Sequence, residues 1–169
     1  MQHNMKLLTF IYSHESIFHD VKQESSQFAI RKSDKSGNPM FEQIVFDEAY
    51  LPKFRELFFD AQSEVTPSVS RYLRDVPYKA EYFETQDFSK NKDYTFSLIL
   101  PDDFNMHMSK PIDIKIKQFI IAYIMYRWLE TKLPEESAIY MQRANMVLSE
   151  AKGLLERRLN PIRRSHRLW

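Results

Sequence analysis

The sequence predicts a mainly α-helical fold with a β-hairpin, an α+β class in which about four helices form a bundle. Apolar residues recur every three or four positions over long stretches, and the period falls to two between residues 78 and 100. The length of 169 residues and the aromatic content of 14% suit one folded domain with a substantial core. We expect a single domain over residues 1–160 and a basic C-terminal tail over 161–169.

The first two helices are predicted from apolar spacing. A short amphipathic helix is expected over about residues 13–25, where Ile17 and Val21 are four positions apart. A cluster of turn residues at 33–39 then predicts a loop. From Phe54 to Tyr72 the apolar residues follow a period of 3.6 over five turns. Pro67 is expected to kink this helix because proline cannot donate to the carbonyl four residues earlier.

The β-hairpin is predicted over about residues 78–100, with arms at 78–84 and 92–100 and a polar loop between them. A two-stranded hairpin is not stable alone in water. We therefore expect it either to pack on its own domain or to pair with a strand of a neighbouring chain.

Two further helices complete the predicted bundle. The helix at 109–131 is apolar on two faces, so it is either central in its domain or partly covered by another subunit. Pro134 opens the last helix, which is expected to run to Arg157 and Arg158. Its apolar stripe includes Ala144 and Leu148 and predicts an antiparallel hairpin with the preceding helix. The small side chain of Ala144 lets the two backbones approach closely.

Charge is unevenly distributed along the chain, although 24 Lys and Arg nearly balance 23 Asp and Glu. Residues 157–169 contain five arginines and no acid, which leaves the remainder of the chain mildly acidic. A basic tail on an acidic body is typical of a chain that binds nucleic acid or an acidic protein surface. The alternative is a solvated tail that completes a helix C-terminus, where arginine is favourable. That alternative explains Arg157 and Arg158 but not the three arginines beyond Pro161.

Several kinds of chemistry are excluded by composition and spacing. With no cysteine there is no disulfide, thiolate nucleophile or cysteine-bound metal, and two glycines cannot build a glycine-rich phosphate loop. His14 and His19 are five residues apart, about 140° around a helix, so they cannot share one ion. His107, between two methionines, is interpreted as loop packing. We therefore expect no catalytic residue, no metal site and no cofactor.

The acidic pairs do not predict catalysis either. Glycosidase chemistry needs two carboxylates that face each other across a cleft, whereas adjacent residues point apart. The pairs at 47–48 and 135–136 are expected at helix N-termini, where acids are favourable. The most apolar window, 119–126, is too short to cross a bilayer. We expect a soluble, intracellular, non-enzymatic protein without a membrane partner.

The segments 123–128, 134–140 and 158–164, together with Ala144 and Leu148, resemble the end of a family of small virion structural proteins. These proteins occur in tailed phages and prophages of Bacteroides-type gut bacteria, including crAss-like phages. The upstream order of elements is also similar, so the resemblance covers about residues 13–164.

The resemblance implies a head-to-tail connector or a neck or tail ring subunit, located in the virion and, during assembly, in the host cytoplasm. Such proteins are mainly helical and form rings below the portal around the DNA channel. Their partners would be copies of the chain, the portal or neighbouring tail and connector proteins, and packaged DNA in the channel. Arg163, Arg164, Arg167 and Trp169 would dock on an adjacent subunit or ring. Trp128 and Tyr140 would lie in the core of the last two helices.

Two competing functions remain open at this stage. A nucleic-acid-binding accessory protein could use the same arginines to neutralise phosphates. It has no basic recognition helix, however, and its cations are concentrated in one short tail. An enzyme of unrecognised type would need a deep pocket with titratable groups of perturbed pKa.

Overall fold

The computed structural model describes residues 5–32, 37, 40–73 and 92–159. Over these residues it confirms a mainly helical fold, with four long helices and a two-stranded antiparallel sheet. In chain order the elements are β1 (Lys6–Tyr12), α1 (His14–Ile30), α2 (Phe41–Ile44), the 3₁₀ turn η1 (Glu48–Tyr50), α3 (Leu51–Val69), the 3₁₀ turn η2 (Ser70–Tyr72), β2 (Tyr94–Leu100), the 3₁₀ turn η3 (Met106–Met108), α4 (Ser109–Leu129) and α5 (Pro134–Leu155).

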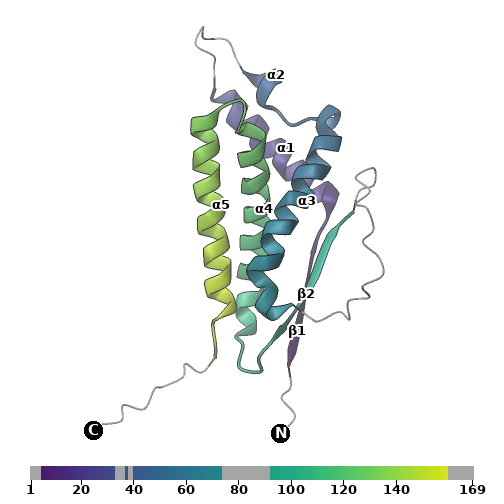
Figure 1. Cartoon of the computed structure of the whole chain (residues 1–169), viewed down its shortest axis with the longest axis vertical. Helices are drawn as coiled ribbons and strands as arrows, with labels where there is room; N and C mark the ends of the chain where they lie inside the picture. The colour runs from purple at the N-terminus through teal and green to yellow at the C-terminus, as the bar shows by residue number, and fades with distance from the viewer. Residues whose placement is uncertain (1–4, 33–36, 38–39, 74–91, 160–169) are drawn as a thin grey trace, which may run out of the picture.

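Helix α4 is the centre of the bundle. It lies between α5 and α3, and α1 also packs against it (Figure 1). Residues on both of its apolar faces are buried, among them Ile116 on one face and Met125 on the other. Of the two alternatives for a helix with two apolar faces, the central position is therefore the one observed. Most of the apolar residues on these faces are covered within the chain, although Ile114 is 44% exposed and lines an open pocket together with the half-buried Ile121.

Two helix boundaries differ from the prediction. Helix α1 continues five residues beyond the predicted end at residue 25, because Ser25 and Ala29 are buried against other segments. The backbone N–H of Phe46 donates to the Ser25 hydroxyl at 2.9 Å, which satisfies this buried polar group. Helix α3 runs through Pro67, ends two residues later at Val69 and continues as η2.

The strand predicted at 92–100 is present as β2, but its strand partner among the described residues was not predicted. β2 pairs antiparallel with β1, with Phe96 opposite Phe10. The other predicted arm, 78–84, lies outside the described residues. Residues 6–12 are apolar on both faces, so they lack the alternation that marks a half-buried strand. The sequence signal for β1 was therefore an undivided apolar run.

The sheet packs on helices of its own chain. Its inner face is aromatic, and Phe10, Tyr12, Tyr94 and Phe96 are all buried there. The Tyr94 hydroxyl is hydrogen-bonded to the Thr66 hydroxyl of α3 at 3.1 Å, and the Tyr12 hydroxyl donates to the Asp113 carbonyl of α4 at 3.5 Å. Burial raises the pKa of both tyrosines. The inner face thus needs no cover from another chain.

Candidate partner-binding site

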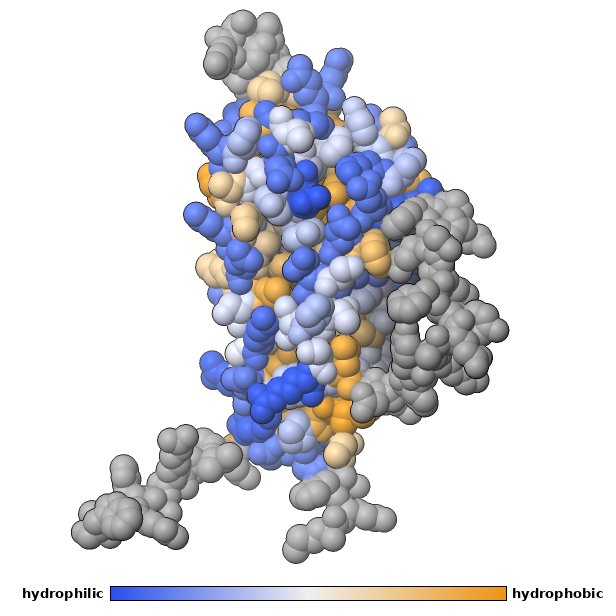
Figure 2. All heavy atoms as spheres, in the orientation of Figure 1, coloured by the Kyte–Doolittle hydropathy of each residue, from blue (hydrophilic) through white to orange (hydrophobic). Residues whose placement is uncertain are grey.

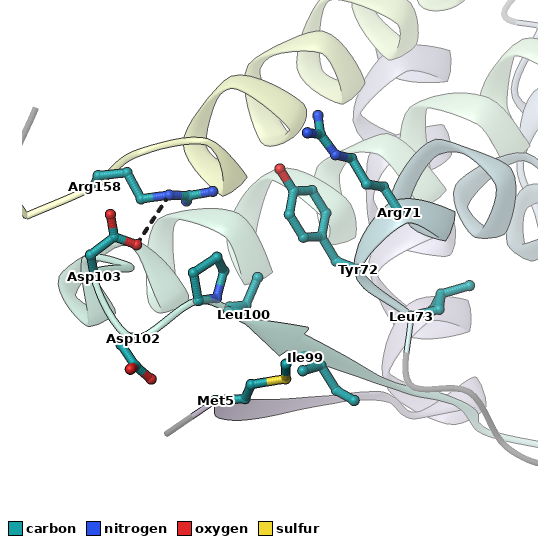
Figure 3. Close-up of a pocket in the computed structure, with 10 residues that line it drawn as sticks. Met5, Arg71, Tyr72, Leu73, Ile99, Leu100, Asp102, Asp103 and Arg158 are labelled. Carbon is teal, nitrogen blue, oxygen red and sulfur yellow. Dashed lines mark ion pairs between the residues drawn. The ribbon is translucent and has the colours of Figure 1, made fainter. Parts of the chain in front are cut away.

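An open pocket of about 720 Å³ lies where β2 ends, beside η2 and the residues that follow α5 (Figure 3). This volume falls in the range of ligand-binding pockets. Figure 2 shows apolar surface at this lower end of the body, next to strongly hydrophilic side chains. The pocket is lined by Met5, Arg71, Tyr72, Leu73, Ile99, Leu100, Pro101, Asp102, Asp103 and Arg158.

One wall of the pocket is fixed by pairing between two turns. Phe104 is fully buried, and its backbone N–H donates to the Pro101 carbonyl at 2.9 Å, which closes the turn after β2. Residues 157–159 pair antiparallel with residues 103–105, with Phe104 opposite Arg158. The Arg158 guanidinium contacts the Asp103 carboxylate at 3.3 Å and donates to the Leu155 carbonyl at the end of α5. The start of the C-terminal segment is thereby held at the rim.

The opposite wall comes from the end of α3. Leu73 forms a bridge with Leu98, on the edge of β2 away from β1. This bridge places the preceding Tyr72 ring over the pocket, where the Arg71 guanidinium lies 5.9 Å from the ring centroid. Three segments that are distant in sequence therefore supply an apolar floor and a cationic, aromatic wall.

The charges at the pocket are partly unpaired. Asp103 is engaged by Arg158, but within the described ranges neither Asp102 nor Arg71 forms an ion pair. The polar and charged groups of its described lining are Arg71, Tyr72, Asp102, Asp103 and Arg158. These groups beside an apolar floor suit a ligand with apolar groups and complementary charge, such as a peptide segment.

The structure places the predicted core residues in contact with more than the last two helices. The Trp128 indole N–H donates to the Ile44 carbonyl at 2.6 Å, and its ring lies 4.2 Å from that of Phe46. The Tyr140 hydroxyl donates to Glu24 of α1 at 3.1 Å. Ala144 is buried and Leu148 half-buried on α5. The predicted tail residues Arg163, Arg164, Arg167 and Trp169 lie outside the described residues.

Lys132 closes the turn between α4 and α5 over Trp128. Its ammonium lies 3.0 Å from the indole centroid and donates to the Gln43 carbonyl at 2.7 Å. Burial lowers the pKa of Lys132 to about 8. These contacts join the helical turn to α2 and give Lys132 a packing role.

The histidines do not form a shared site. His14 is 2% exposed and lies edge-on to Phe54 and Phe58, whereas His19 is exposed. His107 is exposed in η3. Among the described residues no cluster of three or more His, Asp or Glu side chains could hold a metal ion.

The acidic pairs predicted at helix starts have identifiable structural roles. The Asp47 side chain accepts from the backbone N–H of Ala49 at the start of η1, and Glu48 pairs with Lys22. Glu135 and Glu136 lie in the first turn of α5, as predicted. Asp102 and Asp103, by contrast, line the pocket. This position could not be predicted from the sequence, because nothing local indicates which distant segments lie beside Asp102 and Asp103.

Ion pairs engage part of the positive charge of the body. Eight lysines and arginines among the described residues pair with carboxylates, including Lys117 with Asp20 at 2.6 Å and Arg143 with Glu24 at 3.1 Å. In the described ranges, none of the helices combines the length and the hydropathy that a membrane span needs.

Comparison with protein-family models, with curated proteins and with solved structures found no match to this chain.

Proposed function

We propose that this chain is a structural subunit of a tailed-phage particle, a head-to-tail connector or a neck or tail ring subunit. It would assemble below the portal around the DNA channel, with copies of itself and with portal or neighbouring tail proteins as partners. It would act by binding and not by catalysis. The phage assignment is supported by the resemblance of residues 13–164, and the binding role by the pocket.

The observation that carries the proposal is the pocket at the end of β2. It combines a largely apolar lining with Asp102 and Arg71, neither of which has an ion-pair partner in the described ranges. Exposed apolar lining with unsatisfied charge at its edge is characteristic of a surface that a partner completes. The basic segment 157–169 begins at the rim of the same pocket.

Additional apolar surface lies outside the pocket. Leu7 and Ile11 are exposed on the outer face of β1, and Ile139 and Met146 are exposed seven residues apart on α5. Single exposed apolar residues are normal on monomers. These two pairs nevertheless offer places where neighbouring subunits could pack, and Ile114 adds a single exposed apolar side chain on α4.

The alternative function is a nucleic-acid-binding accessory protein. It is favoured by the concentration of arginines in residues 157–169. Eight lysines and arginines of the described residues already pair with carboxylates, which reduces the number of cations available to phosphates. This function therefore predicts DNA binding that depends mainly on the tail.

The test is co-expression of the full chain with a portal protein from the same phage, followed by native mass spectrometry of the complex. A ring of several copies on the portal, and detection of the chain in purified particles, is the expected result. A chain that stays monomeric with portal present and is missing from particles refutes the proposal. A chain that is monomeric in the absence of portal does not refute the proposal, because rings of this kind often assemble only on the portal.

A parallel measurement tests the alternative. The full chain and a variant that lacks residues 161–169 are titrated onto duplex DNA at about 50 mM salt, where phosphate contacts are strong. Tight binding that the deletion abolishes would favour the accessory protein. If the full chain does not bind DNA under these conditions, the accessory-protein function is ruled out.

A further inference from the structure

We infer that the pocket at the end of β2 receives the C-terminal segment, residues 160–169, of a second copy of this chain. The inference rests on the proposed function, because it names the contact that joins one subunit to the next. It depends on three observations: the chemistry of the pocket, the point at which the C-terminal segment leaves the body, and the length of that segment.

The segment and the pocket are chemically complementary. Residues 160–169 contain three arginines together with Ile162, Leu168 and Trp169. An arginine forms a forked, charge-assisted contact with a carboxylate, and Asp102 presents one that is exposed and has no ion-pair partner in the described ranges. The indole of Trp169 suits the apolar lining, where the Arg71 guanidinium can stack on it beside Tyr72.

The chain's own segment cannot continue along the strand at the pocket rim. The Leu159 N–H donates to the Asp103 carbonyl at 2.7 Å, which is the last bond of the antiparallel ladder in the described residues. In this register the next hydrogen-bonded pair would join residues 161 and 101. Both are prolines, and neither has an N–H to donate. The Pro101 carbonyl also already accepts from Phe104. The ladder therefore ends at Leu159.

The direction of departure favours a second copy over the chain's own pocket. Pro161 restricts the preceding Asn160 to extended conformations, which disfavours an immediate reversal. Arg158 is itself part of the pocket wall, so entry by the same chain would require this segment to fold back on itself. Ten residues in extended form span roughly 30 Å, enough to reach a neighbouring subunit.

The contact would be head-to-tail. The pocket and the C-terminal segment are different surfaces of one chain, so their pairing is heterologous and leaves a free pocket and a free segment on every dimer. Repeated contacts of this kind generate a closed ring where the rotation between subunits closes. Such a ring is the assembly that the proposed function requires.

The test uses disulfide trapping in the full chain, which has no cysteine of its own. One variant carries Met5→Cys, an exposed position that lines the pocket, and another carries Ser165→Cys in the C-terminal segment. The two variants are mixed at about 1 mM each, where even a contact with a Kd near 1 mM is occupied to a substantial fraction, and oxidised mildly. We expect a disulfide-linked heterodimer on a non-reducing gel.

The matched control pairs Ser165→Cys with Ile139→Cys, which is also exposed but lies on α5 outside the pocket. Early in the oxidation, the yield of disulfide-linked heterodimer from this control pair should be at least about five-fold lower than the yield from Met5→Cys and Ser165→Cys. Adding Asp102→Lys to the Met5→Cys chain, or Trp169→Ala to the Ser165→Cys chain, should lower the yield by a similar factor. Equal yields for the pocket and control pairs, or yields that neither change reduces, overturn the inference.

A chain that carries both Met5→Cys and Ser165→Cys separates the two sources of the segment. A ladder of covalent oligomers supports docking between copies, whereas an internally cross-linked monomer shows that each chain fills its own pocket and overturns the inference. Native mass spectrometry with portal keeps the two proposals distinguishable. A ring that forms without this cross-link refutes the tail contact alone, and absence of any ring refutes the proposed function.

Discussion

The indole N–H of Trp128 and the carbonyl oxygen of Ile44 are joined by a hydrogen bond of 2.6 Å across 84 residues of sequence. Trp128 is on the central helix α4, and Ile44 ends the four-residue helix α2. The same indole contacts Phe46 and Tyr50 and lies beneath the ammonium of Lys132. Trp128 is therefore one of several contacts, with the Phe46–Ser25 and Lys132–Gln43 hydrogen bonds, that hold the connection between α1 and α3 to the bundle.

Replacing Trp128 with Phe should destabilise the fold by about 1–3 kcal/mol, because the Ile44 carbonyl loses its buried donor. Urea unfolding followed by far-UV circular dichroism measures this change. Tyr140→Phe is the control, since it also removes one hydrogen bond but leaves the partner Glu24 in an ion pair with Arg143. Equal losses for the two variants would contradict the assigned role of the indole.

The pairing of β1 with β2 predicts opposite outcomes for two adjacent residues. Phe10 is 4% exposed on the inner face of the sheet, whereas Ile11 is 65% exposed on the outer face. Phe10→Ala should cost about 3–5 kcal/mol, and Ile11→Ala should cost about 0.5 kcal/mol or less. Urea unfolding of both variants checks the register. Similar losses would mean that residues 6–12 do not form this strand.

The close approach of α4 and α5 depends on small side chains on α5. Ala144 is 2% exposed, so Ala144→Leu should overpack the core and cost about 1–3 kcal/mol. Ala138→Leu makes the same chemical change at an exposed position of the same helix and should be neutral within about 0.5 kcal/mol. Thermal unfolding of both variants measures the difference. A larger loss at Ala138 would contradict the packing described.

Burial of His14 predicts a pH-dependent stability. Its ring nitrogens are buried with no hydrogen-bond partner among the described residues. Desolvation, assisted by Arg55, lowers its pKa, while Asp93 and Glu15 act in the opposite direction. The unfolded chain therefore takes up a proton near pH 6.5, before the folded chain does. This group costs no stability well above pH 6.5, and stability falls as the pH decreases through 6.5 toward the lowered pKa.

The substitution His14→Leu removes the titrating imidazole and fills its place with an apolar side chain of similar size. The free energy of unfolding of wild type and variant is measured by urea at pH 7.5 and pH 5.0. We expect the wild type to lose more stability on acidification than the variant, because the other histidines are common to both. A difference between the two proteins that does not change with pH would rule out the buried, neutral state of His14.

Local pattern was sufficient to predict the helices and one strand. The 3.6-residue period, Pro134 at the start of α5 and the alternation before Pro101 are all carried by neighbours within one or two turns of chain, and the structure has α3, α4, α5 and β2 at or near the predicted positions. Burial of Ala144 followed from its place in an apolar stripe. These local patterns can be recognised in the sequence because they depend only on which face of a helix or strand is apolar.

The partners of these elements were decided by tertiary structure. Nothing in residues 6–12 indicates that they pair with residues 94–100, and the entropic cost of closing a loop rises too slowly with its length to favour the nearer strand. The two apolar faces of α4 were equally compatible with burial in the domain and with a subunit interface until α3, α1 and α5 were placed. The pocket is formed by residue 5, residues 71–73, residues 99–103 and residue 158, which come together only when the chain folds. Sequence thus determined which surfaces are apolar, and the packing of distant segments determined which of those surfaces remain open to a partner.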